Sequence, residues 1–295
     1  MKVLLSGASG FVGSHLRQEL EVAGHQVKSL GRGPRADYGW SDEALREGVN
    51  ATDGIIHLAG ENLFAKRWSK KQKHILRKSR IESTRRLAKL AARFDKAFMI
   101  NASAVGYYGA CGQEPLGEDA PQGTGFVAQL CADWEAAADP ARSAGVRVAC
   151  IRIGVVLGNG GGALQRMLTP FRLGLGGPIG SGQQSFPWIH IEDLARLFRF
   201  LLESPEATGA YNGTAPNGLP MGEFAKLLGK QLKRPAVLPM PAFALRLLLG
   251  EAAKILLTGQ RHVPNRALES GFQFNFTQLE PALEDLLRAK DSSKS

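Results

Sequence analysis

The sequence predicts an α/β protein with a doubly wound parallel sheet and a smaller, mostly helical C-terminal lobe. Two observations indicate this fold class. In roughly the first half of the chain, short apolar segments alternate with longer segments of helical spacing, which is typical of consecutive βαβ units. Beyond about residue 220, most apolar residues follow helical spacing. A chain of 295 residues is long enough to bury a large core and carry a second lobe.

The expected elements begin with a buried strand at 2–6 (KVLLS) and a glycine-rich turn (GASGFVG). The next helix places Val12, Leu16 and Leu20 four residues apart and ends at Gly24. The remaining elements follow from the same two patterns. Strands are expected at 25–32, 53–60, 96–103, 146–158 and 209–215, helices at 68–94 and 126–138, and a strand followed by a helix at 188–202.

Glycine-rich sequence between residues 158 and 187 interrupts this alternation, and we expect a loop region with one helix there. It is not a linker between independent domains. The larger, Rossmann-like domain is therefore predicted to comprise residues 1–160 and 187–213. The smaller lobe, which would hold the substrate, comprises residues 161–186 and 214–295.

Several functional classes are excluded by composition. The three cysteines (Cys111, Cys131 and Cys150) have no Cys-x-x-Cys spacing and are odd in number, which favours a reducing cytoplasm over a disulfide framework. The six histidines are scattered, so no structural metal is expected. The most apolar stretch, residues 242–257, is too short and too charged to cross a membrane and predicts an amphipathic helix.

The net charge of +10 is concentrated in one segment, residues 66–89, which holds eleven Lys and Arg and one Glu. Such a stripe suits nucleic acid or a phosphorylated ligand, but it is equally typical of a solvated helix face. Because no nucleic-acid motif or basic–aromatic interleaving accompanies the charge, we expect no nucleic-acid partner and no membrane partner.

The glycine-rich turn has the spacing Gly7-x-x-Gly10-x-x-Gly13 between a strand and a helix. Glycines allow a tight turn and close approach of the backbone to a pyrophosphate, which the N–H groups at the helix N-terminus then bind. An ordinary βα turn is the alternative. The predicted contacts are Gly7, Ser9, Gly10, Phe11, Val12 and Gly13.

The second strand ends at Gly31 and Arg32, where NAD-binding chains usually place Asp or Glu. A guanidinium at this point can pair with the 2′-phosphate of NADP, and no carboxylate is present to repel it. The sequence therefore predicts NADP(H) as the cofactor. The alternative is an arginine in a surface loop with no ligand.

Five further motifs are characteristic of one family: HLAGEN at 57–62, SAVGYYG at 103–109, RIGVVLGNGGGAL at 152–164, GLGGPIGSGQQSFPWIHIEDLA at 174–195 and GQRHVPNRALESGF at 259–272. With the glycine motif, they make the whole chain resemble the atypical short-chain dehydrogenase/reductases called epimerase family proteins, relatives of sugar-nucleotide epimerases. Some members carry the label cell division inhibitor. The resemblance implies that Leu58, Ala59 and Gly60 line the ribose or adenine and that Arg80 faces the cofactor.

In the wider superfamily, a Ser, a Tyr and a Lys act together on the substrate oxygen. Ser103 matches the serine, but Phe126 and Leu130 stand where Tyr-x-x-x-Lys is expected. Phe cannot carry a proton, and Leu cannot lower a pKa. Tyr107 and Tyr108, which follow the strand at 96–103, are the candidate replacements for the proton donor. The alternative is that they are packed aromatic residues of the cleft wall.

Candidate substrate contacts are Glu61 and Asn62, which follow the third strand, and Trp188 and His190 in the long middle motif. A buried, hydrogen-bonded His190 is the alternative. Two functional hypotheses remain open. One is an NADP(H)-dependent oxidoreductase or epimerase-like enzyme with an altered proton donor and a small-molecule substrate, of the kind that sugar-nucleotide epimerases bind. The other is a non-catalytic NADP(H)-binding sensor or partner-binding module. The sequence leaves the oligomeric state open.

Overall fold

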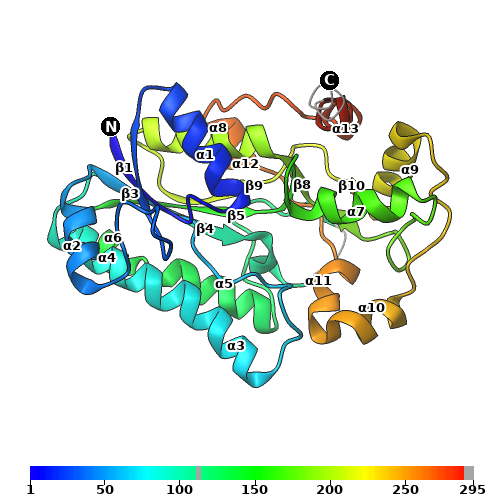
Figure 1. Cartoon of the computed structure of the whole chain (residues 1–295), viewed down its shortest axis with the longest axis horizontal. Helices are drawn as coiled ribbons and strands as arrows, with labels where there is room; N and C mark the ends of the chain where they lie inside the picture. Colours follow the sequence, from blue (N-terminus) through cyan, green and yellow to red (C-terminus); the bar gives the residue numbers. More distant parts are fainter. Residues whose placement is uncertain (111–113, 289–295) are drawn as a thin grey trace.

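The computed structural model describes residues 1–110 and 114–288. Within them, six parallel strands form the central sheet in the order β2-β1-β3-β4-β5-β9 (Figure 1). The predicted fold class, a Rossmann-like doubly wound sheet with a second lobe, is confirmed. The strands are β1 (Lys2–Ser6), β2 (Gln26–Leu30), β3 (Gly54–His57), β4 (Phe98–Ala104), β5 (Arg147–Ile153) and β9 (Gly209–Gly213).

Helices cover both faces of this sheet, as expected for strands that are apolar on both sides. One face carries α1 (Phe11–Val22) and α8 (Ile191–Glu203). The other carries α2 (Asp42–Asn50), α4 (Ser83–Arg93), α5 (Phe126–Ala136) and α6 (Asp139–Ser143). The helix predicted at 68–94 is in fact three segments: α3 (Lys70–Arg77), a π-helical turn η1 (Lys78–Glu82) and α4.

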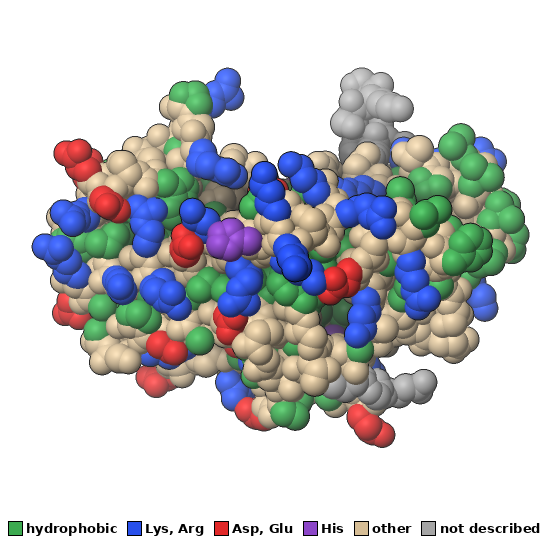
Figure 2. Space-filling view, turned by 90° about the horizontal axis from the view of Figure 1, so that it is seen from below, with side chains coloured by type: hydrophobic (Ala, Val, Ile, Leu, Met, Phe, Trp, Pro, Cys, Tyr) green, Lys and Arg blue, Asp and Glu red, His purple; other side chains and the backbone are tan. Residues whose placement is uncertain are grey.

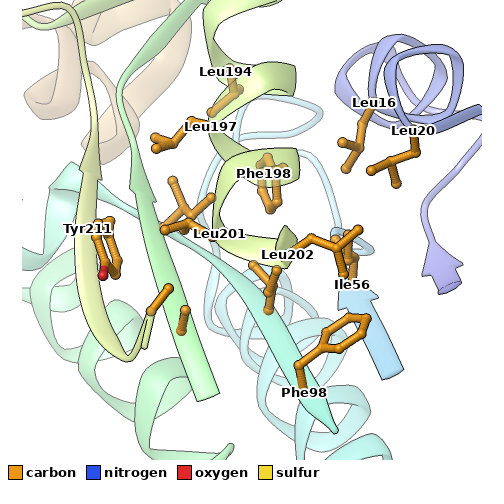
Figure 3. Packing of buried hydrophobic residues seen from close by; sticks show 14 of the residues in the cluster. Leu16, Leu20, Ile56, Phe98, Leu194, Leu197, Phe198, Leu201, Leu202 and Tyr211 are labelled. Atoms are coloured by element: carbon orange, nitrogen blue, oxygen red, sulfur yellow. The ribbon is translucent and has the colours of Figure 1, made fainter. Parts of the chain in front are cut away.

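The core between the sheet and the first pair of helices is built from helical spacing. Leu16 and Leu20 of α1 point toward a row of apolar side chains on α8, and Phe98 and Ile56 of the sheet lie beneath them (Figure 3). Each side chain of this size contributes about 1.5–3 kcal/mol when fully buried. The row on α8 comprises Leu194, Leu197, Phe198, Leu201 and Leu202.

The smaller lobe has its own core beyond the carboxyl edge of the sheet. The segment 214–295, predicted to belong wholly to this lobe, does not stay in it, because α12 (Asn265–Glu269) packs on β9. The lobe contains α7 (Gly162–Arg172), α9 (Met221–Leu232), α10 (Ala242–Leu249), α11 (Ala253–Leu257), α13 (Leu279–Arg288) and two strand pairs, β6 (Val155–Leu157) with β8 (Trp188–His190) and β7 (Ser185–Phe186) with β10 (Leu219–Pro220).

The apolar stretch 242–257 forms two short helices, α10 and α11, where the sequence predicted one. Gly250, with φ +62°, ends α10 in a conformation that other residues rarely adopt. Over the described ranges, none of the helices combines the length and apolar character needed to span a bilayer. The cytoplasmic location expected from the cysteines stays a prediction.

The basic segment 66–89 lies on the lower side of the molecule in Figure 1, and Lys and Arg side chains are spread over that side in Figure 2. Three of its cations form ion pairs with acids elsewhere in the chain: Lys73 with Glu251, Arg77 with Asp133 and Arg86 with Asp42. Acidic side chains are also interspersed on this face (Figure 2). The arrangement is that of a solvated face, and the absence of a nucleic-acid partner stays a prediction.

Candidate functional site

The order of the sheet strands reverses between β1 and β3. After β1 the chain adds β2 on one side and then returns to add β3 on the other. In open α/β sheets, ligands bind outside the carboxyl ends of the strands at such a switch point. The glycine loop at 7–13 follows β1, and the segment 58–62 follows β3, so both border this crevice.

The glycine loop has a shape that only glycine permits. Gly7 has φ +74°, and a Cβ on Gly13 would lie 2.1 Å from the carbonyl oxygen of Gly7. Helix α1 starts after Gly10 with no side-chain cap and no acid in its first turn. The N–H groups of Phe11, Val12 and Gly13 are therefore available to an anion at the positive end of the helix dipole.

The side chains of the predicted loop contacts fit this arrangement. Ser9 is exposed beside the helix start, Val12 packs against the core, and the ring of Phe11 lies against Gly161 and Gly162. The loop offers backbone N–H groups, one hydroxyl and no carboxylate. These groups suit a pyrophosphate, so the residues present fit a dinucleotide cofactor.

A buried hydroxyl–imidazole chain fixes the loop to β3. Oγ of Ser6 accepts hydrogen bonds from the N–H groups of Leu58 (3.1 Å) and Ala59 (3.2 Å), and so donates its own hydrogen to Nδ1 of His57. Nε2 of His57 donates to Oγ of Ser83 (3.0 Å). Burial lowers the pKa of His57 to about 3, so its imidazole is neutral.

Two exposed arginines, Arg32 and Arg35, follow β2. The sequence predicts Arg32 as a cofactor contact but not Arg35. The acid of this loop, Asp37, is occupied: its carboxylate accepts from the hydroxyl (2.6 Å) and the N–H (2.8 Å) of Ser29. These hydrogen bonds lower the pKa of Asp37. Gly31 and the two guanidinium groups thus leave a cationic, carboxylate-poor surface at the predicted site of the adenosine phosphate.

Arg80 does not face the crevice, which corrects the prediction for this residue. Its guanidinium is buried below Gly60, where it donates to the carbonyl of Glu61 (2.8 Å) and lies 5.1 Å from the ring centroid of Trp134. Burial lowers its pKa. Arg80 therefore supports the segment after β3 from beneath, while Leu58 and Ala59 are half-buried at the crevice and Gly60 is exposed.

Glu61 and Asn62, the predicted substrate contacts after β3, differ in how they are held. The N–H of Glu61 donates to Oγ of Ser79 (3.1 Å), and its half-buried carboxylate stays at the edge of the sheet. Oδ1 of Asn62 accepts from the N–H of Phe64 (2.8 Å), which closes a turn. A substrate contact by either residue stays a prediction, and the geometry favours Glu61.

Three neighbouring strands place a polar residue in the same row at the carboxyl edge. Ser103 of β4 lies beside Arg152 of β5, and Arg152 lies beside Asn212 of β9. Ser103 donates to Oε1 of Glu135 on α5 (2.6 Å), and Arg152 binds both carboxylate oxygens of Glu135, at 2.9 and 3.0 Å. This buried network is the part of the site that the sequence did not reveal.

Tyr108, one of the two predicted proton donors, is not at the cleft. It belongs to the buried network. Its ring is fully buried. Its hydroxyl donates to Oδ1 of Asn212 (2.7 Å), and the phenol oxygen accepts from Nη1 of Arg152 (2.9 Å). Burial raises the pKa of Tyr108. Ser103 is likewise committed, because its hydrogen is donated to Glu135. Neither group is placed to donate to a substrate.

Tyr107 is the predicted donor that remains at the edge. It lies in the 3₁₀ turn η2 (Val105–Tyr108), is half-buried, and its ring centroid is 3.5 Å from the guanidinium carbon of Arg152. Within residues 1–110 and 114–288, its hydroxyl has no hydrogen-bond partner. A side chain with a held ring and a free hydroxyl is suited to proton donation.

The face of α5 that meets the end of β4 is one residue away from the predicted one. A Cβ on Gly106 would lie 2.4 Å from Val127 and 3.7 Å from the sulfur of Cys131, and Glu135 continues this face one turn further. Because one residue corresponds to about 100° of helix rotation, Phe126 and Leu130 point elsewhere. They pack in a separate apolar cluster with Leu63, Trp68, Leu76, Ile81 and Ala137.

The shift by one residue leaves the chemical conclusion intact. Val127 and Cys131 are the side chains of α5 that lie against Gly106 at the end of β4, and neither can do the work of a tyrosine and lysine pair. Burial raises the pKa of the Cys131 thiol to about 12, so it is a neutral, apolar group at pH 7.

Trp188 and His190 are predicted from the sequence to contact the substrate, but in the structure both have structural roles. The side chain of Trp188 is fully buried in the core of the smaller lobe. Nδ1 of His190 accepts from the N–H of Glu192 (3.2 Å) and caps α8, and its ring stacks on Phe276 at 3.9 Å. His190 thus follows the alternative weighed for it, a buried and hydrogen-bonded histidine.

Comparison with known proteins shows the family to which the chain is similar. Residues 3–212 match the NAD dependent epimerase/dehydratase family, and residues 240–286 match a domain of unknown function, DUF1731. The mouse epimerase family protein SDR39U1 is 43% identical over 296 residues, which cover 97% of this chain and 100% of the relative.

Solved structures similar to the chain include two that share more than 30% of its sequence. The human epimerase family protein SDR39U1 (isoform 2), crystallised with NADPH, has a TM-score of 0.91 and 39% identity over 97% of this chain and 99% of its own. A nucleoside-diphosphate sugar epimerase from Corynebacterium glutamicum has a TM-score of 0.81 and 32% identity, over 97% of this chain and 58% of its own.

Proposed function

This chain belongs to the NAD dependent epimerase/dehydratase family, and from that premise we propose that it is an NADP(H)-dependent oxidoreductase or epimerase-like enzyme whose proton donor is Tyr107. The observation that carries the proposal is the carboxyl edge of the sheet at β1, β2 and β4. An uncapped helix N-terminus, two exposed arginines and a tyrosine whose hydroxyl has no partner among the described residues border this edge.

The choice of NADP(H) is supported by the human relative, which was crystallised with NADPH. In this chain the N–H groups of Phe11, Val12 and Gly13 would hold the pyrophosphate. Arg32 and Arg35 would pair with the 2′-phosphate of the adenosine. When bound, the cofactor supplies or accepts the hydride.

The remaining step is proton transfer, and Tyr107 is the group for it. In the reducing direction, its hydroxyl donates a proton to the substrate oxygen while the carbonyl becomes an alcohol. Because Tyr107 is half-buried at the edge, it can take a proton back from water. The substrate is a small molecule with a carbonyl or secondary alcohol. A sugar-nucleotide-like compound is the first class to examine, given the relative from Corynebacterium glutamicum.

A specific observation favours a second candidate function, an NADP(H)-binding sensor without turnover. Ser103 and Tyr108 are locked in a buried network, and Val127 and Cys131 occupy the cleft-facing positions of α5. A sensor needs the cofactor loop alone, whereas an enzyme also needs the free hydroxyl of Tyr107.

We expect NADPH to bind about 10- to 100-fold more tightly than NADH, since charge-assisted hydrogen bonds to the 2′-phosphate are worth roughly 1.5–3 kcal/mol. Arg32→Asp should weaken NADPH binding at least tenfold and leave NADH binding unchanged. Arg46→Asp, the same charge change at an exposed position of α2, should affect neither. Calorimetric titration of both cofactors measures this, and equal affinities in the unmodified protein would contradict the assignment.

Turnover separates the two candidate functions. We expect NADPH to be oxidised in the presence of at least one member of a carbonyl panel that includes sugar nucleotides, as followed by loss of its absorbance. If NADPH binds tightly but a broad panel gives no oxidation, the sensor is the better description.

A further inference from the structure

Arg152 occupies a position where the sheet pattern demands an apolar side chain. On the face of β5 covered by α5 and α6, Val148 and Cys150 precede it at every second residue, and both lie in the apolar core. Arg152 itself is buried. A buried guanidinium is costly unless its charge and its donors are all satisfied, so its environment is informative.

Four of the five N–H donors of the guanidinium make hydrogen bonds. Nε and Nη2 bind the two carboxylate oxygens of Glu135, and Nη1 donates to the hydroxyl of Tyr108 (2.9 Å) and to the carbonyl of Glu118 (3.0 Å). Burial disfavours the charge, but the hydrogen bonds and charge of Glu135 outweigh it and raise the pKa of Arg152. The cation is therefore permanent and fixed in its plane.

The flat face of the guanidinium carries the ring of Tyr107. The distance from its central carbon to the ring centroid is 3.5 Å, which is the separation of a stacked cation–π pair. The rings of Tyr107 and Tyr108 meet edge to face, at 5.4 Å and 84°. Tyr107 is thus held on two sides, by groups that belong to the buried network.

We propose that Arg152 is the positioning residue for Tyr107, which rests on the function proposed above for Tyr107. Arg152 holds the phenol ring at the carboxyl edge of the sheet. Because the carboxylate of Glu135 binds the edge of the guanidinium, Arg152 acts on Tyr107 by holding its ring in place. Glu135 holds Arg152 through two hydrogen bonds, and Ser103 in turn donates a hydrogen bond to Glu135.

The contact is tested first without turnover, by fluorine NMR of protein labelled with 3-fluorotyrosine. The chain has four tyrosines, and Tyr107→Phe identifies the signal of Tyr107. We expect Arg152→Lys, which keeps the charge but removes the flat face, to shift that signal and leave the signal of Tyr38 in place. A Tyr107 signal that does not respond to Arg152→Lys would overturn the proposal.

Arg147→Lys is the matched control. Arg147 is the first residue of the same strand, its guanidinium lies 5.6 Å from the ring centroid of Phe98, and it donates to the carbonyl groups of Leu201 and Leu202. We expect it to leave the Tyr107 signal unchanged. If Arg152→Lys does not fold, Arg152→Met with Glu135→Gln removes both charges together and leaves no unpaired ion in the core.

Kinetics then test the action through Tyr107. We expect Arg152→Lys to lower kcat at least about tenfold, with KM and NADPH affinity within about twofold. In a Tyr107→Phe background the same change should cause no further loss, because the group through which it acts is already gone. An additive loss would mean that Arg152 acts elsewhere.

If the fluorine signal shifts but the unmodified protein has no turnover, the positioning contact stands and the proposed function fails. If Tyr107→Phe lowers turnover but Arg152→Lys does not, the proposed function stands and the positioning role of Arg152 fails.

Discussion

Acidification from pH 7 to pH 5 is expected to remove about 4 kcal/mol of the free energy of unfolding, contributed by two buried histidines. Burial lowers the pKa of His57 to about 3 and that of His262 to about 4, against about 6.5 in the unfolded chain. Below pH 6.5 the unfolded state therefore binds more protons than the folded state. The stability is fully present above pH 6.5 and is lost as the pH falls toward 4. Glu118, whose pKa is raised by burial, offsets part of the loss.

Urea unfolding at pH 7, 6 and 5 measures this dependence. Each of His57→Gln and His262→Gln should reduce the pH slope by about half, because each removes one of the two titrating groups. A free energy of unfolding that is constant between pH 7 and pH 5 would show that both imidazoles are protonated equally in the folded and unfolded states.

The sequence predicts the larger domain well because its signals are local. The strand at 2–6 has the bounds of β1, and the glycine motif has the positive φ and close contacts that its spacing indicates. Local periodicity cannot reveal the break in the helix at 68–94. The π-helical turn at Lys78–Glu82 is where Ser79 and Arg80 hydrogen-bond to the segment after β3, a tertiary contact.

The error on α5 has a similar cause. The residue before the helix is Gly125, with φ +98° and no capping side chain, so the sequence offers no signal that fixes where the first turn points. An apolar residue at 126 and another at 130 were compatible with the face toward β4. The structure gives that face to Val127 and Cys131 and packs Leu130 beneath Leu76 and Ile81.

The polar row could be predicted only in part. Each of Ser103, Arg152 and Asn212 is a polar residue near the end of an apolar strand, and that signal is visible in the sequence. Their meeting depends on the register of strands about fifty residues apart, which the sequence does not encode locally. For the same reason, the sequence could not distinguish Tyr107 from Tyr108. Adjacent residues in a 3₁₀ turn point in different directions, and one is buried while the other is half-exposed.

Tyr108→Phe and Ser103→Ala are the variants against which Tyr107 is judged. Tyr108→Phe removes the hydroxyl that bonds Oδ1 of Asn212 and Nη1 of Arg152, and Ser103→Ala removes a donor to Glu135. We expect both to lower the free energy of unfolding by about 1–3 kcal/mol. Since neither hydroxyl is placed to donate to a substrate, kcat should fall far less in either variant than on loss of the donor itself.

Tyr107→Phe is expected to lower kcat with NADPH by about 10²-fold, the lower end of the range for loss of a general acid. The ring still stacks on Arg152 in this variant, so the free energy of unfolding and the NADPH affinity should stay close to those of the unmodified protein. A change confined to kcat distinguishes a lost proton donor from a lost packing contact, because the latter would lower stability with it. The measurement compares initial rates of NADPH oxidation for the three variants at saturating substrate. If Tyr107→Phe turns over as fast as the unmodified protein, the proton comes from elsewhere, and Glu61 becomes the next side chain to replace, because it lies at the same edge with a half-buried carboxylate.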